Sequence, residues 1–330
     1  MALDGGPFET VTGTAMPSPM LYRRALPAGA AFSRWAAADG WSHRRFDWPA
    51  TGTPRGSILF QGGRGDIVEK YLESSAHWHA TGWSITGFDW RGQGGSGRLS
   101  PDAHVGHVTD FGAYIADIAG FWAGWAPTAL GPKVVMGHSM GGHLTLRALV
   151  EGAIAPDAAV LIAPMLGLHA PLGWTWLGER VARLLGGVGN SARAAWRDNE
   201  IPGAKAARQA LLTHDKARYQ DELFWKSAHP ELELGPPSWR WVIEAFRSTR
   251  ALDADPRLRT MAVPVLALIA DADKLVNAKT AAAVVAKLPD ARVVRFGSES
   301  AHEILREVDA VRNRALAEID LFLAARARPE

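Results

Sequence analysis

Six short apolar runs constrain the fold of this 330-residue chain more strongly than any other feature of its sequence. They begin at Ser57 (SILFQ), Ser84 (SITGFDW), Lys133 (KVVMGHS), Ala158 (AAVLIAP), Val263 (VPVLALIA) and Ala291 (ARVVRF). Most of them are separated by longer stretches with helical patterning. This alternation is typical of strands buried on both faces of a parallel sheet, with helices as the connections. We therefore predict an α/β fold in which helices flank a mostly parallel central sheet.

The strand pattern changes at two places along the chain. Residues 32–50 (FSRWAAADGWSHRRFDWPA) have a pattern that suits antiparallel strands, which we expect at one edge of the sheet. Farther along, the strand signal disappears and tryptophan-rich helical segments replace it. We therefore predict a core formed by residues 1–164 and 251–330, with residues 165–250 inserted between them as a helical cap.

The composition excludes several classes of protein. The formal net charge is only +2 and the basic residues are scattered, so no nucleic-acid partner is expected. The chain has no cysteine, which excludes disulfides, a thiolate metal site and a cysteine nucleophile. It has neither a secretory leader pattern nor about 18 consecutive apolar residues, so we expect a cytoplasmic protein that acts on a small molecule or a lipid.

A serine between glycines follows the third apolar run and precedes a helical pattern. The segment Gly137-His138-Ser139-Met140-Gly141 reads G-x-S-x-G, which in this strand-to-helix context is typical of a nucleophile elbow. At such an elbow the serine sits in a strained turn, and glycines on either side prevent clashes. We predict that Ser139 is a catalytic nucleophile.

A serine nucleophile needs a histidine that accepts its proton and a carboxylate that orients the histidine. Asp271 and Asp273 follow the run VPVLALIA, and His302 lies in a loop after the last run and before the final helical pattern. The order Ser, Asp, His along the chain is the order found in enzymes whose serine lies at such a nucleophile elbow. We predict His302 as the base and prefer Asp273 to Asp271 as the acid, because Asp273 lies farther into the turn. Surface or packing roles are expected for most of the other histidines.

The oxyanion formed during acyl transfer needs backbone N–H donors. The N–H group of Met140, directly after the serine, is predicted as one donor. The second is expected from the glycine-rich loop QGGRGDIVEKY, where Gly63 and Arg64 are both candidates. This loop lacks the Gly-Lys-Ser/Thr sequence of a phosphate-binding loop.

These motifs together give the chain a clear family resemblance. FQGGRGDIVEKY, GFDWRGQGGSGR, GHSMGG, ADADKLV and AHEILRE resemble the α/β-hydrolase superfamily, and more narrowly its bacterial lysophospholipase and monoacylglycerol lipase branch. The resemblance implies an α/β-hydrolase fold, the roles of Ser139, Asp273 and His302 given above, and a helical cap over an acyl pocket. The loop reads Gln61-Gly62-Gly63-Arg64 where many members of the superfamily carry His-Gly, so the choice between Gly63 and Arg64 as the donor stays open.

We therefore expect a serine carboxylic ester hydrolase that cleaves a single-acyl-chain lipid ester, lysophospholipid or monoacylglycerol, through an acyl-enzyme. No metal or organic cofactor is expected, and a transient contact with the inner membrane surface is compatible with such a substrate. The alternatives are a small-ester esterase, a C–C hydrolase, a cofactor-free haloperoxidase or a ligand-binding protein without activity. Acyl length, head group and oligomeric state stay open.

One segment of the predicted cap has a distinct apolar face. In LGERVARLL, apolar residues recur at Leu177, Val181, Leu184 and Leu185, one face of a helix. We expect this face to pack onto the protein. The alternative is that it lines the acyl entrance, with the neighbouring arginines near a lipid head group or an anionic membrane surface.

Overall fold

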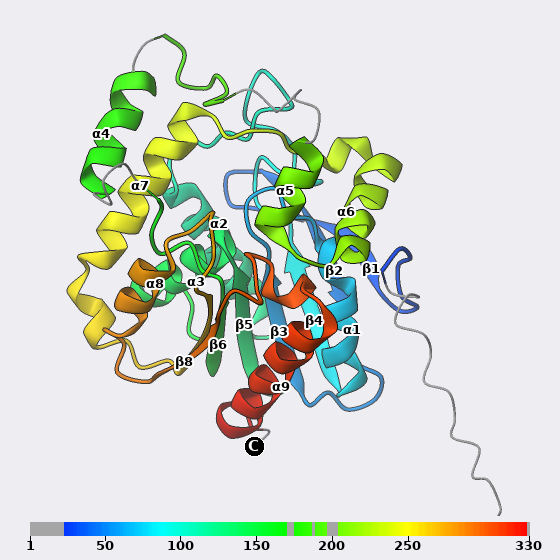
Figure 1. The fold of residues 1–330 in the computed structure, drawn as a ribbon. Helices are drawn as coiled ribbons and strands as arrows, with labels where there is room; N and C mark the ends of the chain where they lie inside the picture. The colour runs from blue at the N-terminus through cyan, green and yellow to red at the C-terminus, as the bar shows by residue number, and fades with distance from the viewer. Residues whose placement is uncertain (1–22, 170–174, 187–188, 197–203, 329–330) are drawn as a thin grey trace, which may run out of the picture.

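The computed structural model describes residues 23–169, 175–186, 189–196 and 204–328 of the chain (Figure 1). The described strands form a sheet of eight in the order β1-β2-β4-β3-β5-β6-β7-β8. They are β1 (Ala31–Ala36), β2 (Ser42–Trp48), β3 (Gly56–Gln61), β4 (Trp83–Phe88), β5 (Lys133–His138), β6 (Ala158–Ile162), β7 (Val265–Ala270) and β8 (Ala291–Phe296).

The pairing of the strands confirms the predicted sheet. From β4 through β3 to β8 neighbouring strands are parallel, and β1 and β2 add an antiparallel edge beside β4. All six apolar runs form strands within two residues of the predicted starts. Strand β7 begins at Val265 instead of Val263, directly after Pro264, which has no N–H group to donate to a neighbouring strand.

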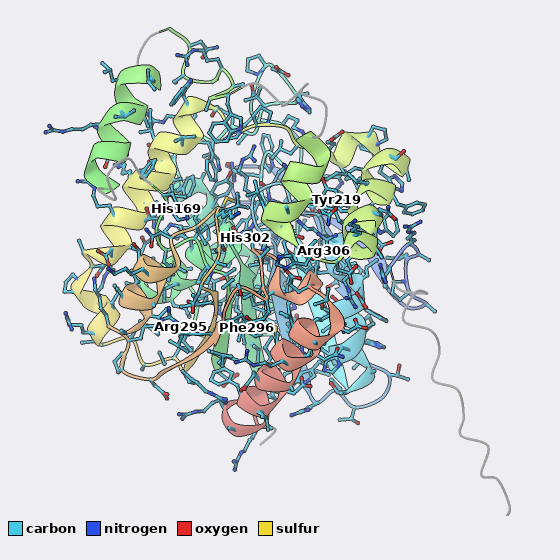
Figure 2. The ribbon with its side chains drawn as sticks, in the orientation of Figure 1. His169, Tyr219, Arg295, Phe296, His302 and Arg306 are labelled. Carbon is cyan, nitrogen blue, oxygen red and sulfur yellow. The ribbon has the colours of Figure 1, made fainter. Side chains whose placement is uncertain are left out.

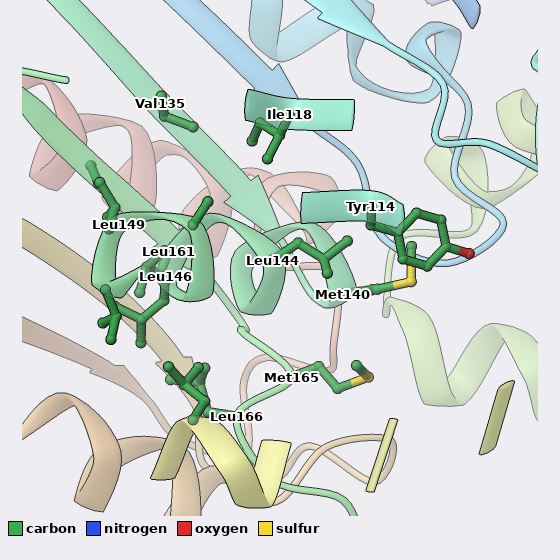
Figure 3. Packing of buried hydrophobic residues seen from close by; sticks show 14 of the residues in the cluster. Tyr114, Ile118, Val135, Met140, Leu144, Leu146, Leu149, Leu161, Met165 and Leu166 are labelled. Atoms are coloured by element: carbon green, nitrogen blue, oxygen red, sulfur yellow. The ribbon is translucent and has the colours of Figure 1, made fainter. Parts of the chain in front are cut away.

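Helices cover both faces of the sheet, so its central strands are buried on both sides. Along β5, Val135 points into a cluster with α2 (Gly112–Trp125), α3 (Met140–Val150) and α8 (Ala278–Val285). Its neighbours Val134 and Met136 point into the cluster with α1 (Leu72–Ala80) and α9 (Asp309–Arg326). Figure 3 shows part of the first cluster around α3. This two-sided burial explains why β5 reads as a continuous apolar run rather than an alternating one.

The chain between β6 and β7 contributes helices beyond the end of the sheet where β3 and β5 finish (Figure 1). The described residues of 165–250 contain no strand. Helix α7 continues three residues past the predicted boundary, to Asp253. The helices are α4 (Thr175–Gly186), α5 (Ala204–Leu212), α6 (Lys216–Ala228) and α7 (Trp239–Asp253).

Helix α4 does not pack in the way its apolar pattern predicts. Leu184 and Leu185 are 73% and 47% exposed, and Val181 is 37% exposed, so the expected burial of this face is wrong. Small residues of α4 contact α7 instead of these apolar ones. Ala182 is buried against α7, and a Cβ atom on Gly186 would lie 2.9 Å from Trp239 Cβ. The side chain of Leu177 lies outside the described part. None of the described helices combines the length and apolarity needed to cross a bilayer.

Candidate active site

Ser139 occupies the turn between β5 and α3. Its φ of 51° lies in the left-handed region, which a residue with a side chain rarely adopts. Two backbone hydrogen bonds fix the turn: Ser139 N–H donates to Ile162 O at 2.9 Å, and Ser139 O accepts from Met165 N–H at 2.9 Å. The predicted elbow geometry is therefore present, with the serine partly exposed at its tip.

The glycines around Ser139 are required by close backbone contacts. A Cβ atom on Gly137 would lie 2.6 Å from Gly141 C, and one on Gly141 would lie 2.4 Å from the carbonyl oxygens of Gln61 and Gly62. Backbone atoms cannot move aside as a side chain can. The G-x-S-x-G spacing thus allows α3 to pass directly against the end of β3.

His302 and Asp273 form a buried pair. His302 Nδ1 lies 2.5 Å from Asp273 Oδ2, and both side chains are almost completely buried. The other carboxylate oxygen, Oδ1, accepts hydrogen bonds from the N–H groups of Leu275 and Val276 at 2.8 and 3.1 Å. These bonds hold the carboxylate in place, and Asp273 in turn holds the imidazole ring.

Asp271 lies elsewhere. Its carboxylate contacts the Arg295 guanidinium of β8 at 2.6 Å, and the pair is largely exposed. Of the two candidate acids, Asp273 therefore contacts His302, whereas Asp271 takes part in an exposed ion pair.

The structure brings the histidine to the elbow. The ring of His138, the residue before Ser139, lies 4.9 Å from the ring of His302 between centroids. Figure 2 labels His302 on the segment that leads into α9, below α5 in this view. The predicted nucleophile, base and acid thus come from the ends of β5, β8 and β7.

The candidate oxyanion donors also lie here. Met140 is the first residue of α3, so its N–H group has no acceptor within the helix. Gly63 lies against the serine, because a Cβ atom on it would be 2.9 Å from Ser139 Cβ. Its N–H group donates to Asp66 Oδ2 at 2.7 Å. The Arg64 guanidinium donates to Gly235 O and lies 5.5 Å from the ring centre of Trp241.

Sequence reasoning missed a second histidine–carboxylate pair beside the first. Asp66 Oδ2 accepts from the Tyr71 hydroxyl at 2.8 Å and lies 2.8 Å from His138 Nδ1. A signal was present in the sequence, since His138 directly precedes Ser139 and Asp66 lies in the glycine-rich loop. Only the fold shows that these two segments meet.

The buried charges shift the pKa values of the pair. Burial favours neutral His302, but the Asp273 carboxylate, together with Glu303 and Asp66, raises the pKa of His302 above its ordinary value. Burial also favours neutral Asp273, yet His302 and the two backbone N–H groups lower its pKa. Asp273 is therefore ionised over the pH range in which His302 titrates.

This arrangement has the groups required for nucleophilic acyl transfer: a serine in a strained turn, a buried histidine oriented by a carboxylate, and backbone donors beside the serine. A neutral His302, held through Nδ1, keeps Nε2 as a proton acceptor. The same groups suit ester, thioester or amide cleavage, so the geometry alone defines a reaction type rather than a substrate.

Comparison with known proteins identifies a family and relatives for this chain. Residues 52–309 match the family model described as serine aminopeptidase, S33. Lysophospholipase L2 of Escherichia coli is 29% identical over 276 residues, 79% of this chain and 78% of the relative. The probable lysophospholipase L2 of Haemophilus influenzae is 27% identical over 277 residues, 81% of this chain and 83% of the relative. A soluble variant of monoglyceride lipase from Saccharomyces cerevisiae, solved with a substrate analogue, has a TM-score of 0.73 at 20% identity, covering 94% of this chain and 99% of that one. The predicted α/β-hydrolase fold is confirmed.

Proposed function

This chain belongs to the serine aminopeptidase S33 family, and on that premise we propose that it is a serine carboxylic ester hydrolase acting on single-acyl-chain lipid esters. The observation that carries the proposal is Ser139 at a strained elbow beside the buried His302–Asp273 pair. Lysophospholipids and monoacylglycerols are the proposed substrates. The relatives support this class, since two are a lysophospholipase and a probable lysophospholipase and the structural neighbour is a monoglyceride lipase.

The proposed reaction has two halves. Ser139 Oγ attacks the ester carbonyl while His302 Nε2 takes the hydroxyl proton, and the new C–O bond gives a tetrahedral oxyanion. His302 then gives this proton to the leaving alcohol as the original ester bond breaks, which leaves the acyl-enzyme. In the second half His302 takes a proton from water, which attacks the acyl group, and returns the proton to Ser139 Oγ as the acyl–serine bond breaks and the fatty acid leaves. Asp273 stabilises the imidazolium in both halves.

Backbone donors would stabilise the oxyanion in both halves. Met140 N–H is the first proposed donor, and Gly63 or Arg64 supplies the second. The hydrogen bond from Gly63 N–H to Asp66 bears on this choice, because an N–H group that already donates to a carboxylate forms only a weak second hydrogen bond to an oxyanion. Movement of Asp66 would release the Gly63 N–H group for the oxyanion.

We further propose that residues 165–250 form a cap over the acyl-binding region. Trp241 of α7 packs on Phe111 with ring centres 5.6 Å apart. Phe111 belongs to the same apolar cluster as Met140 and Leu144, which lie at the start of α3 beside the nucleophile (Figure 3). The core and the insertion thus share one apolar cluster beside the nucleophile, and apolar surroundings suit a fatty acyl chain better than a polar substrate.

The exposed face of α4 supports a finer proposal about the substrate's location. Val181, Leu184 and Leu185 are exposed, and Arg180 and Arg183 are exposed on the same helix. Apolar side chains next to arginines on one helix are typical of segments that lie on anionic membranes. We propose that α4 contacts such a surface transiently, which would bring the cap to the lipid.

A substrate panel tests the proposed function. It consists of p-nitrophenyl esters from acetyl to dodecanoyl, lysophosphatidylcholine, monoacylglycerol and an aminoacyl p-nitroanilide, each with wild type and Ser139→Ala. The proposal predicts fatty-acid release from at least one lipid, a preference for long acyl chains, and no activity in the variant. Preference for acetyl esters would identify a small-ester esterase instead, and cleavage of the anilide alone would identify a peptidase.

A further inference from the structure

A buried ionic cluster lies behind the candidate active site. Three cationic and three anionic side chains, each at most 9% exposed, contact one another there. Ionised, they sum to zero charge, so the cluster needs no ion from solvent. Its members are Lys70, Lys226, Arg306, Asp66, Glu222 and Glu303.

Lys70 lies at the centre of this cluster. Its ammonium donates to Asp66 Oδ1 at 2.6 Å and to Glu303 Oε1 at 2.5 Å, and it lies 3.3 Å from Glu222 Oε2. An ammonium group has three N–H donors, and here each faces a carboxylate from a different segment. Burial favours the neutral amine, but these carboxylates raise the pKa of Lys70 and keep it charged.

Two of the three carboxylates lead directly to the proposed catalytic groups. Asp66 holds the Gly63 N–H group at 2.7 Å and lies 2.8 Å from Nδ1 of His138, the residue before the nucleophile. Glu303 is the residue after His302, and its own N–H group donates to Leu212 O at 2.8 Å. One buried ammonium thus connects the loop beside the serine with the turn that carries the histidine. The two residues that make this connection, Lys70 and Glu303, are 233 positions apart in the sequence.

We propose that Lys70 is a positioning residue that holds the Gly63 loop and the His302 turn in register with each other. The proposal rests on the proposed hydrolase function, because register between these segments matters only if both serve one reaction. Lys70 itself lies behind the site and acts through Asp66 and Glu303. A misplacement of about 1 Å between catalytic groups can lower turnover on the order of 100-fold, so such a link has a measurable effect.

The competing explanation is that Lys70 merely neutralises buried carboxylates. The cluster provides a matched pair of double variants that separates the two. Lys70→Met with Glu222→Gln, and Lys226→Met with Glu222→Gln, each remove one buried ammonium and the same carboxylate charge. Both leave the cluster neutral. Only the first breaks the connection from Asp66 to Glu303, because Lys226 pairs with Glu222.

Steady-state kinetics on a short, soluble p-nitrophenyl ester compare these variants after circular dichroism has shown that both are folded. Positioning predicts a kcat reduced about 10- to 100-fold, with little change in KM, in the Lys70→Met double variant. The Lys226→Met double variant is expected to stay within about threefold of wild type, because it removes a neutral charge pair and leaves the contacts of Lys70 with Asp66 and Glu303 intact. Equal kcat values in the two double variants would overturn the proposal.

Amide hydrogen exchange of the wild-type protein supplies a second measurement. It requires no folded variant and no enzymatic activity. If Lys70 holds the two segments together, the Gly63 and Glu303 amides open in one event, with the same opening free energy and the same denaturant dependence. Two unrelated opening free energies would overturn the link even in an active enzyme. A common opening in a protein that hydrolyses no ester would support the link and contradict the proposed function instead.

Discussion

The imidazole of His302 is held by Asp273 at 2.5 Å, whereas Asp271, two residues earlier, pairs with Arg295 on a neighbouring strand. The chain turns directly after β7, so these two carboxylates point in different directions, whereas residues two apart in a continuing strand would share a face. Asp273 also receives two backbone hydrogen bonds, so its position is fixed before any substrate binds.

The first prediction separates these two aspartates. Asp273→Asn should lower kcat by about 10³- to 10⁴-fold, because the amide favours the wrong histidine tautomer and cannot stabilise the imidazolium. Asp271→Asn should leave the rate within about a factor of two, since an exposed ion pair contributes little. Initial rates of ester hydrolysis measure both, and full activity of Asp273→Asn would contradict its assignment as the acid.

The second prediction concerns the nucleophile and base. Ser139→Ala and His302→Ala should each lower the rate on the order of 10⁴-fold or more. The double variant should lose little further, because the two groups act as one unit in proton transfer. Additive losses in the double variant would show that the two residues act independently.

The third prediction is the pH dependence. His302 must be neutral to accept a proton, and its pKa is raised, so kcat/KM should reach half its maximum above the ordinary histidine value of about 6.5. Asp273→Asn removes the main group that raises this pKa, so its residual activity should reach half-maximum at lower pH. A shift to higher pH, or an unchanged profile, would show that another group limits the rate.

The fourth prediction compares two helical glycines. Gly141→Ala should destabilise the protein by about 1 to 3 kcal/mol or more, because the new methyl group meets the carbonyl oxygens of Gln61 and Gly62. Gly124→Ala in α2 has open space around it and should stabilise by about 0.5 to 1 kcal/mol. Urea unfolding measures both changes. Equal stability of the two variants would mean that α3 does not approach β3 as closely as described.

The fifth prediction concerns the exposed face of α4. Leu184→Asp with Leu185→Asp should reduce co-sedimentation with phosphatidylglycerol vesicles, and should slow hydrolysis of lipid in those vesicles more than hydrolysis of a soluble short ester. Leu130→Asp with Leu321→Asp is a matched control, because both leucines are 62% exposed and lie before β5 and in α9 rather than in α4. Equal effects in the two proteins would remove α4 from the proposed membrane contact.

Local sequence was enough to predict the sheet and the elbow. The run at Lys133 forms a strand that begins at the same residue, because Val134, Val135 and Met136 are buried on both faces of the sheet. The G-x-S-x-G segment is similarly local, since its strain and its glycine contacts arise from one strand-to-helix turn. The positions of Asp273 and His302 at strand ends followed from the parallel topology.

Features that depend on partners distant in sequence could not be predicted in this way. The apolar pattern of α4 suggested that its leucines are buried, but packing on α7 selects Ala182 and Gly186, which allow close approach. The cluster around Lys70 joins residues from three segments, and no periodicity reveals that this lysine, in a short 3-10 helix before α1, meets a glutamate 233 positions away.

The most direct test of lipid-ester hydrolysis by Ser139 is the site of covalent labelling by a long-chain alkyl fluorophosphonate, located by peptide mass spectrometry. We predict one label per chain, on Ser139, formed more slowly in the presence of lysophosphatidylcholine or monoacylglycerol. His302→Ala should abolish labelling although its serine is intact, because the hydroxyl then has no proton acceptor. A label on another residue, or labelling of Ser139 that neither lipid slows, would contradict the claim that this serine hydrolyses lipid esters.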